Sequence, residues 1–597
     1  MLMVQLPPKE TLPQLIRRSL QEPRDEVLVE RVDGVFAPSS SQTLLRRVEE
    51  IACAIRDAGL QAGDRVGLIA HDCVDWIVCD FATFFAGCVV VPVFPTQALD
   101  NTKYILEHSE AKLLFVDSAQ TQSRLAGAMA LPHTVVFASD GDDGLAAFET
   151  RGAAVRAAHP ELPTAYQTAR PDDLAVLIYT SGTTGNPKGV MLSHDNLAFD
   201  AYEAGAHSGA LSAGSSVLSV LPFSHIYEHT MIYIYLQRKY RYSICHDPNA
   251  LLEDLQAIRP EALTCVPRIF DKVLAGIITK SAKAGGAQAK LVPWALETGR
   301  KYAHAKTFGD GPGPGLSLQY AIAKALVFKK LRKVLGLDRL VYFSSGSAAL
   351  HIDVAMTYLG MEMPIVQGYG LTETSPVITV NRPESNYYGT VGPPLDGVDI
   401  KIAGDGEILT RGRHVMLGYY RDPEATSATI VDGWLHTGDI GEIDEHGALT
   451  ITDRKKEVFK TDTGKFVAPA RVEAAIKRSS YVAQAMVVGD GRPHPAALVA
   501  PNWDLLKTEI SLADGAPEDW VARDDVRKFV TEQVVAETAD LGSYEQIRRV
   551  LVIPHEFSVE SGELSPSFKI KRRVVEERYR DRIAAAYAVD LHAKGYV

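Results

Sequence analysis

The residues best suited to chemistry lie in residues 179–189, which read Tyr-Thr-Ser-Gly-Thr-Thr-Gly-Asn-Pro-Lys-Gly. This stretch combines three glycines, four Ser or Thr hydroxyls and one lysine. Glycine lets backbone N–H groups approach an anion closely, hydroxyls add donors or metal contacts, and lysine adds a compact positive charge. The stretch therefore predicts a loop that holds phosphate groups, as in ATP. Its candidate contacts are Thr180, Ser181, Gly182, Thr183, Thr184, Gly185 and Lys188.

Two well-known phosphate-binding patterns do not fit this loop. A Walker loop needs G-x-x-x-x-G-K-[ST], whereas Lys188 lies between Pro187 and Gly189. The dinucleotide-binding pattern G-x-G-x-x-G is also absent from the stretch. Composition alone leaves a second interpretation open, in which the stretch is an ordinary surface loop rich in Gly, Ser and Thr.

A buried strand must present this loop, because the apolar run Leu174–Ile178 precedes it directly. Strand-like segments also cover residues 66–69 and 111–116, and residues 44–58 have the pattern of a helix. Helix-like and strand-like segments alternate in this way through most of the N-terminal half and beyond. Such alternation predicts an α/β fold of stacked layers with mainly parallel sheets.

The size and charge of the chain restrict its class. Its 597 residues exceed what one core supports, so we expect two or more domains. The net charge of −12 argues against a nucleic-acid-binding surface as the main function. The six cysteines form no C-x-x-C pair, and four lie in apolar sequence within residues 53–88, which favours reduced thiols and a cytoplasmic enzyme.

No targeting or membrane-spanning segment stands out in the sequence. Met1–Lys9 lacks the long apolar region of a signal peptide. The most apolar stretch, residues 81–95, contains Pro92 and is too short to cross a bilayer. We interpret it as a buried helix over residues 76–86 that runs into a buried strand over residues 89–93.

Two neighbouring regions interrupt the alternation. Residues 279–318 are rich in Ala, Lys and Gly and predict an insertion that ends in a mobile loop. Residues 320–335 predict an amphipathic helix, which either packs on the core with a solvated basic side or contacts a membrane surface. Its apolar stripe would be Tyr320, Val327, Leu331 and Val334, and its basic side Lys329, Arg332 and Lys333.

A run of five charges, Asp-Arg-Lys-Lys-Glu at residues 453–457, follows a strand-like segment at 448–452. Such a run is typical of a solvated turn, and its position also suits a domain boundary. The residues after it are numerous enough for a small α/β domain of their own.

Five motifs, taken in order, carry a resemblance to a known family. They are residues 179–189, 367–374 (Gln-Gly-Tyr-Gly-Leu-Thr-Glu-Thr), 432–439 (Asp-Gly-Trp-Leu-His-Thr-Gly-Asp), 453–457 and 566–572 (Pro-Ser-Phe-Lys-Ile-Lys-Arg). Together they resemble the adenylate-forming superfamily, over residues 40 to 575 approximately. Residues 266–270 and the insertion after them look like its long-chain fatty acyl-CoA synthetase (ligase) branch.

The resemblance implies a domain plan and a reaction. An N-terminal domain (1–452) would bind ATP and the fatty acid, a hinge (453–457) would follow, and a small mobile C-terminal domain (458–597) would carry the catalytic lysine. Fatty acid and ATP with Mg²⁺ would give acyl-AMP and pyrophosphate, and coenzyme A would then take the acyl group and release AMP. Rotation at the hinge would carry Lys569 away and bring residues 463–469 towards the intermediate.

The resemblance also implies roles for single residues around the phosphates. Lys569 would stabilise negative charge at the α-phosphorus, and Thr372 would donate to the α-phosphate. Glu373, with Thr180, would hold Mg²⁺ through hard oxygen ligands. His225, in Leu-Pro-Phe-Ser-His at 221–225, would lie beside the carboxylate of the fatty acid. The helix-like residues 226–235 would either wall an alkyl tunnel or be plain core.

The remaining implied contacts surround the nucleoside. Tyr369 would stack on the adenine, and Asp439 would accept hydrogen bonds from the ribose hydroxyls. Gly346 would pass beside the adenine, although the family more often has a second glycine where this chain has Ser347. Further nucleotide contacts would come from Gln367, Gly368, Arg454, Lys456 and Lys460.

Two other functions stay open at this point. His225-x-x-Glu228-His229 fits the inverted zinc-peptidase signature, which would make the chain a metallopeptidase. An acyl-AMP ligase would instead pass its acyl group to a carrier protein. Such ligases usually carry an extra segment late in the N-terminal domain, and none is obvious between Thr374 and Asp439, which favours coenzyme A. The sequence assigns no oligomeric state.

Overall fold

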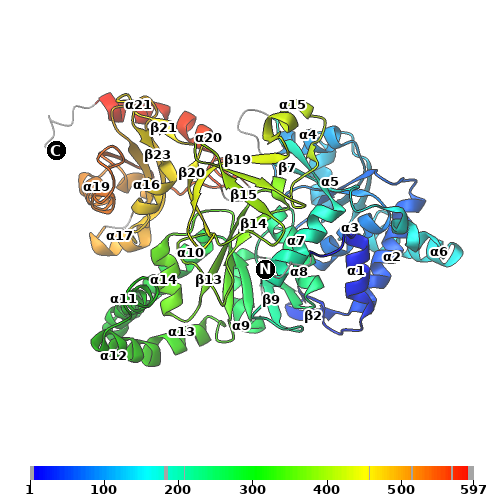
Figure 1. The fold of residues 1–597 in the computed structure, drawn as a ribbon, viewed down its shortest axis with the longest axis horizontal. Helices are drawn as coiled ribbons and strands as arrows, with labels where there is room; N and C mark the ends of the chain where they lie inside the picture. The colour runs from blue at the N-terminus through cyan, green and yellow to red at the C-terminus, as the bar shows by residue number, and fades with distance from the viewer. Residues whose placement is uncertain are drawn as a thin grey trace.

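The structure, a computed structural model, describes residues 6–180, 186–207, 209–245, 247–455, 457–512, 515–565 and 569–588. It has a large part that holds most of the chain and a smaller C-terminal part, drawn in orange and red at the upper left of Figure 1. Among the residues described, no helix is both long enough and apolar enough to cross a bilayer.

The first large sheet confirms the predicted strands at 66–69, 111–116 and 174–178. In spatial order it contains β17 (Gly418–Tyr419), β8 (Lys188–Ser193), β7 (Leu174–Thr180), β4 (Val89–Pro92), β3 (Arg65–Ile69), β5 (Ala111–Val116) and β6 (His133–Val136). The strands from β7 to β6 are parallel, whereas β8 and β17 pair antiparallel. Strand β7 therefore ends where the phosphate-binding loop was predicted to begin.

The second large sheet is also mainly parallel. Its order is β14 (Val377–Val380), β13 (Ile365–Gly370), β12 (Tyr342–Ser345), β11 (Ala262–Cys265), β9 (Ser216–Ser219), β10 (Arg241–Ile244), β1 (Leu28–Val32) and β2 (Val35–Ser39). Only the two edge strands, β14 and β2, pair antiparallel. The α/β prediction with mainly parallel sheets is confirmed.

Helices cover these sheets, and the most apolar of them are enclosed. They are α1 (Leu12–Gln21), α2 (Ser41–Asp57), α3 (Val74–Phe85), α4 (Leu99–Ser109), α5 (Ala119–Ala126), α6 (Leu145–Ala158), α7 (His194–Ala206), α8 (Ile226–Gln237), α9 (Leu251–Ile258), α10 (Pro267–Ala284), α11 (Gly286–Phe308) and α14 (Ile352–Gly360). Nearly every residue of α3 is buried, as expected for a helix that is apolar all round.

The C-terminal part has apolar cores of its own. It contains β21 (Phe459–Lys460), β22 (Phe466–Val467), α16 (Pro469–Ile476), β23 (Val482–Val488), β24 (Ala496–Pro501), α17 (Trp503–Glu509), α18 (Pro517–Trp520), α19 (Asp524–Thr538), β25 (Arg549–Val552), α20 (Arg572–Arg578) and α21 (Arg580–Ala588). Two apolar clusters draw only on this part of the chain.

A small antiparallel sheet precedes it, formed by β15 (Asp399–Ile402), β16 (Glu407–Arg411), β18 (Ile430–Val431), β19 (Trp434–Ile443) and β20 (Leu449–Arg454). Helix α15 (Pro423–Thr429) lies beside it in the chain. The charged run at 453–457 starts inside β20, because Asp453 and Arg454 still pair with β19.

The predicted amphipathic helix at 320–335 contains a π turn in its middle. It consists of α12 (Pro314–Ala323), a π turn (Lys324–Phe328) and α13 (Lys329–Val334). The predicted apolar stripe is wrong at Val334, which is 51% exposed. The predicted basic side is wrong at Arg332, which is half-buried and donates to backbone carbonyls of the following turn. The π turn is the cause, because its wider winding rotates α13 relative to α12.

Candidate active site

One cavity of about 1230 Å³ lies where the large sheets and the C-terminal part meet. The carboxyl ends of β4, β7, β9, β10, β12 and β13 all contribute residues to its lining. Ligands of open α/β sheets bind at this edge, because the loops that leave the strands converge there. The C-terminal part closes the cavity from the other side, with Val559, Glu560, Gly562, Leu564, Ser565, Lys569 and Lys571 in the lining.

Ten of the predicted site residues line this cavity: Thr180, Lys188, His225, Gly346, Gly368, Tyr369, Thr372, Glu373, Arg454 and Lys569. Asp439 lies behind two of them, as the hydrogen bonds below show. Gln367 and Lys460 are not among the lining residues. Lys460 lies on β21, with its ammonium over the ring of Phe466. Ser181, Gly182, Thr183, Thr184, Gly185 and Lys456 lie outside the described residues.

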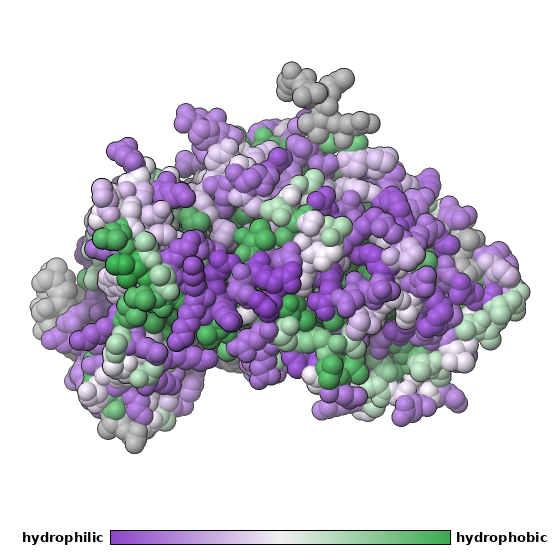
Figure 2. All heavy atoms as spheres, turned by 90° about the horizontal axis from the view of Figure 1, so that it is seen from below, coloured by the Kyte–Doolittle hydropathy of each residue, from purple (hydrophilic) through white to green (hydrophobic). Residues whose placement is uncertain are grey.

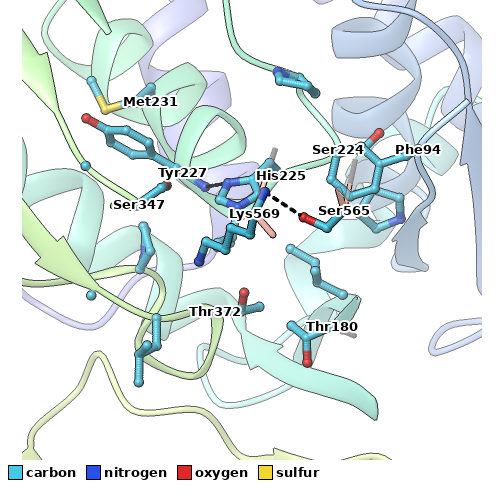
Figure 3. Close-up of a pocket in the computed structure, with 18 of the residues that line it drawn as sticks. Phe94, Thr180, Ser224, His225, Tyr227, Met231, Ser347, Thr372, Ser565 and Lys569 are labelled. Carbon is cyan, nitrogen blue, oxygen red and sulfur yellow. Dashed lines mark hydrogen bonds between the residues drawn. The ribbon is translucent and has the colours of Figure 1, made fainter. Parts of the chain in front are cut away.

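Lys569 enters the cavity from the C-terminal part. Its backbone N–H donates to Oγ of Ser565 (3.1 Å), and the Ser565 N–H donates to its carbonyl (2.8 Å), which forms a tight loop. Figure 3 shows its side chain between His225 and Thr372. Enclosure by protein lowers the pKa of the Lys569 ammonium, and the nearby charge of Arg454 adds to this effect.

His225 faces Lys569 in a defined protonation state. It precedes α8, where its Nδ1 accepts a hydrogen bond from the backbone N–H of Tyr227 (3.2 Å). Burial lowers the pKa of His225 to about 3, and the charge of Lys569 adds to the shift. The imidazole is therefore neutral near pH 7, with its proton on Nε2. It can donate one hydrogen bond into the cavity.

The nucleoside side of the cavity is built on paired strands. Asp439 on β19 lies opposite Arg454 on β20. Its Oδ1 accepts from Nε of Arg454 (3.0 Å), and its Oδ2 accepts from the hydroxyl of Tyr369 (2.7 Å). Each carboxylate oxygen can accept a second donor, so Asp439 keeps capacity for ribose hydroxyls. Tyr369 itself is largely buried, with 9% of its surface exposed.

Tyr419 is a residue of the site that sequence reasoning missed. Its hydroxyl donates to Oε1 of Glu373 (2.9 Å), and its ring lies 4.9 Å from the ammonium of Lys188. It therefore contacts both a predicted metal-binding carboxylate and a predicted phosphate-binding cation. The signal was weak, because Tyr419 follows Gly418 on a two-residue strand, β17, with no motif around it.

The predicted metal ligands, Glu373 and Thr180, suit Mg²⁺ bound to ATP better than a metal held by protein side chains alone. Among the described residues, no group of three or more His, Cys, Asp or Glu could hold a metal. Mg²⁺ typically uses one or two carboxylates and takes its other ligands from phosphates and water. Glu373 and Thr180 both line the cavity, so they fit Mg²⁺ that arrives with ATP.

Asp72 is a second residue that the sequence reasoning missed. It lines the cavity, and its Oδ1 accepts from the backbone N–H of Phe223 (2.9 Å), which fixes the segment that leads to His225. Burial raises the pKa of Asp72 to about 7. A signal was present, since Asp72 follows the buried strand β3 at its carboxyl end.

His229 and Glu228 of the inverted zinc-peptidase signature form hydrogen bonds with side chains of the core. His229 is buried, and its Nε2 contacts Oδ1 of Asp80 (3.0 Å) and the hydroxyl of Tyr233 (2.7 Å). Glu228 accepts from the hydroxyl of Tyr242 (2.5 Å), and burial raises its pKa to about 8. These contacts explain the H-x-x-E-H pattern as core packing, and they leave no peptidase centre there.

Comparison with known proteins places this geometry in a family. Residues 17–420 match the model described as AMP-binding enzyme, and residues 457–590 match AMP-binding enzyme C-terminal domain. The chain belongs to the AMP-binding enzyme family. This AMP-binding enzyme is 34% identical to the long-chain-fatty-acid–CoA ligase FadD15 of Mycobacterium bovis over 573 residues, 94% of each chain.

A second relative and a solved structure agree. The long-chain-fatty-acid–CoA ligase ACSBG2 of Xenopus laevis is 31% identical over 579 residues, which cover 89% of this AMP-binding enzyme and 77% of that protein. The crystal structure of the anthranilate CoA ligase AuaEII with anthranoyl-AMP has the same fold, with a TM-score of 0.73 at 18% identity over 97% of this chain and 99% of that one. The predicted family and fold class are confirmed.

Proposed function

We propose that this enzyme ligates a long-chain fatty acid to coenzyme A through an acyl-AMP intermediate. The observation that carries the proposal is the position of Lys569, which the C-terminal part delivers into the cavity that holds Thr372, Glu373 and His225. The names of the relatives supply the acyl and acceptor classes, and the cavity supplies the residues that the first half-reaction needs.

In the first half-reaction, a carboxylate oxygen of the fatty acid forms a bond to the α-phosphorus of ATP. The bond from that phosphorus to the bridging oxygen of pyrophosphate breaks. Negative charge builds up around the phosphorus, so the Lys569 ammonium stabilises the transition state more than the ground state. The neutral His225 donates from Nε2 to the incoming carboxylate, which orients it without cancelling its charge.

The lowered pKa of Lys569 fits this role. No side-chain hydrogen bond of Lys569 is present among the described residues, so its ammonium is not committed to a protein acceptor. Anionic substrates would supply the missing acceptors and would raise the pKa of Lys569 again.

The second half-reaction requires the C-terminal part, residues 458–597, to turn about the hinge at 453–457. Support comes from its separate apolar cores and from the hairpin of β21 and β22, because none of residues 463–469 lines the cavity. Phe466 on this hairpin is 66% exposed. Rotation would bring this hairpin to the acyl-AMP, where the coenzyme A thiolate attacks the acyl carbon and AMP leaves.

The acyl chain is assigned to the apolar side of the cavity. Helix α8 contributes Tyr227, Met231 and Tyr235 to the lining there. Its other face is fixed to α3 by the buried Asp80–His229 contact. The helix therefore forms a firm wall, which suits a bound alkyl chain better than a water-filled polar groove.

We place the enzyme in the cytoplasm. All six cysteines are free thiols, five of them buried, which supports a reducing compartment.

Thioester formation across acids from octanoate to stearate, with ATP, Mg²⁺ and coenzyme A, tests the proposal. The expected result is acyl-CoA, AMP and pyrophosphate, with the highest kcat/KM for the long acids. No thioester from any long-chain acid would overturn the substrate assignment. Acyl-AMP without thioester would instead identify an acyl-AMP ligase that needs a carrier protein.

A further inference from the structure

The helical extension of residues 286–334 presents an unusual concentration of exposed apolar side chains. In the part of the chain that the structure describes, fifteen large apolar side chains are exposed, and five of them lie within residues 308–334: Phe308, Leu318, Ile322, Leu326 and Val334. Figure 2 shows green side chains gathered at the left of the molecule, over the region where Figure 1 places α11 to α13.

Three of these side chains form one continuous face. Leu318, Ile322 and Leu326 follow each other at intervals of four residues, so they lie on one side of the helix. They are 65%, 42% and 57% exposed. The opposite side is anchored, because Val327 and Phe328 are buried in the core that also contains Tyr227 and Cys245 of the cavity lining. The exposed face is therefore held in place, and it is not a frayed end.

A basic cluster continues this face. Lys329, Lys330 and Lys333 are exposed on α13, directly after the apolar side chains. Within the described part of the chain, none of the three forms an ion pair, whereas the neighbouring Lys324 and Arg332 both contact Glu362. The cluster is local, because the whole chain carries a net charge of −12. Figure 2 shows a dense purple band beside the green side chains.

We propose that this face, Leu318, Ile322 and Leu326 with Lys329, Lys330 and Lys333, docks on an anionic lipid surface. A helix that lies in the membrane interface combines a shallow apolar face with lysines that reach anionic headgroups. The face is exposed and is followed by lysines without ion pairs among the described residues, which suits a broad negative surface. A second copy of the chain is a less suitable partner, because its lysines would face the same lysines of the first copy. The proposal rests on the proposed function, because a long-chain fatty acid is itself concentrated in membranes.

Binding of the full-length protein to vesicles tests this surface. The vesicles contain phosphatidylcholine alone or with about one third phosphatidylglycerol. Co-sedimentation should show binding to the anionic vesicles that weakens with added salt. Replacing Lys329, Lys330 and Lys333 by Gln should weaken that binding by about fivefold for each lysine. The triple change L318S, I322S and L326S should weaken it by roughly tenfold or more.

The control replaces exposed apolar side chains elsewhere, V35S and V535S, which are 69% and 44% exposed. Its vesicle binding should match the wild type. No binding of the wild type to anionic vesicles, or equal loss in the control, would overturn the proposal. A wild-type dimer that the Leu/Ile triple variant converts to monomer would also overturn it, because the face would then be an interface between copies.

The experiments distinguish an error in the lipid-binding proposal from an error in the proposed function. Thioester formation from a fatty acid supplied free in solution should be unchanged in both variants. With the same acid supplied in anionic vesicles, the rate should fall in the variants and not in the control. If the wild type makes no thioester in either format, the proposed function fails, while the vesicle-binding result still decides the surface.

Discussion

The two sides of the cavity hold their functional side chains in different ways. On the N-terminal side, charged groups are fixed by other side chains, as Glu373 is by Tyr419 and Asp439 is by Arg454. On the C-terminal side, Lys569 is fixed through its backbone, in the two hydrogen bonds with Ser565. The first arrangement suits a binding site that stays unchanged, and the second suits the proposed departure of Lys569 with the C-terminal part.

This difference follows the needs of the two half-reactions. The nucleotide stays bound through both, so its contacts benefit from preorganisation. In the proposed mechanism the lysine serves only the first half-reaction, and it would have no side-chain partner to break when it leaves. Substitutions on each side of the cavity test this division of labour.

The largest effect is expected for Lys569→Ala. Acyl-AMP formation should fall by roughly 10²–10³, the usual loss for one well-placed electrostatic contact. Thioester formation from supplied acyl-AMP should change little, because the lysine has no role there. The two half-reactions are measured separately by pyrophosphate release and by acyl-CoA formation. Lys571→Ala is the matched control, and an equal loss in that variant would contradict the assignment to Lys569.

Asp453→Pro tests the hinge. The proline ring would fix the backbone angle φ at position 453 and so oppose rotation there. Thioester formation from acyl-AMP should therefore fall by about tenfold or more, while acyl-AMP formation is retained. Thermal melting and the first half-reaction together show that the variant is folded. Equal loss in both half-reactions would argue against rotation at this position.

Tyr419→Phe tests the fixed side of the cavity. It removes the hydroxyl that contacts Glu373 but keeps the ring beside Lys188. One lost hydrogen bond to a charged group predicts an increase of about tenfold in the Mg²⁺ concentration for half-maximal rate. High Mg²⁺ should restore the rate. The neighbouring Tyr420→Phe is the control, and an effect on maximal rate that Mg²⁺ does not restore would contradict the positioning role.

Asp72→Asn should give the smallest effect, a change in how stability depends on pH. Burial raises the pKa of Asp72 from 3.8 to about 7, so the folded state binds more protons than the unfolded state between these values. This contribution to stability is fully present below the unfolded pKa and is lost as the pH rises through about 7.

From pH 5 to pH 8, the melting temperature of the wild type should therefore fall by a few degrees more than that of Asp72→Asn. The exposed Asp57→Asn should behave like the wild type. If the melting temperature changes with pH in the same way in all three proteins, the prediction of a raised pKa for Asp72 is contradicted.

Much of the fold could be read from the sequence because local patterns decide it. The apolar run before the phosphate-binding loop became β7, and the helix predicted at 44–58 is α2 (Ser41–Asp57). The region at 320–335 was read less well. Its helical character was predicted, but the π turn rotated the faces, and a regular period of 3.6 residues cannot anticipate that rotation.

Some residues of the candidate site could also be named from the sequence, and others could not. Motif residues such as Tyr369, Glu373 and Lys569 could be named from the sequence, because each lies in a short motif that resembles the adenylate-forming superfamily. Tyr419 and Asp72 could not, because their partners, Glu373 and Phe223, lie 46 and 151 residues away in the chain. Contacts of that separation leave no local pattern to detect.

By itself, the sequence determined the α/β class, the family and the residue types that chemistry requires. The class follows from local patterns and the family from the resemblance of short motifs, and folding alters neither. Only the tertiary structure decided that His225 is neutral beside Lys569, that Tyr419 fixes Glu373, and that Leu318, Ile322 and Leu326 face outward. Each of these depends on which distant side chains share a volume from which water is excluded, and only the packed chain sets that.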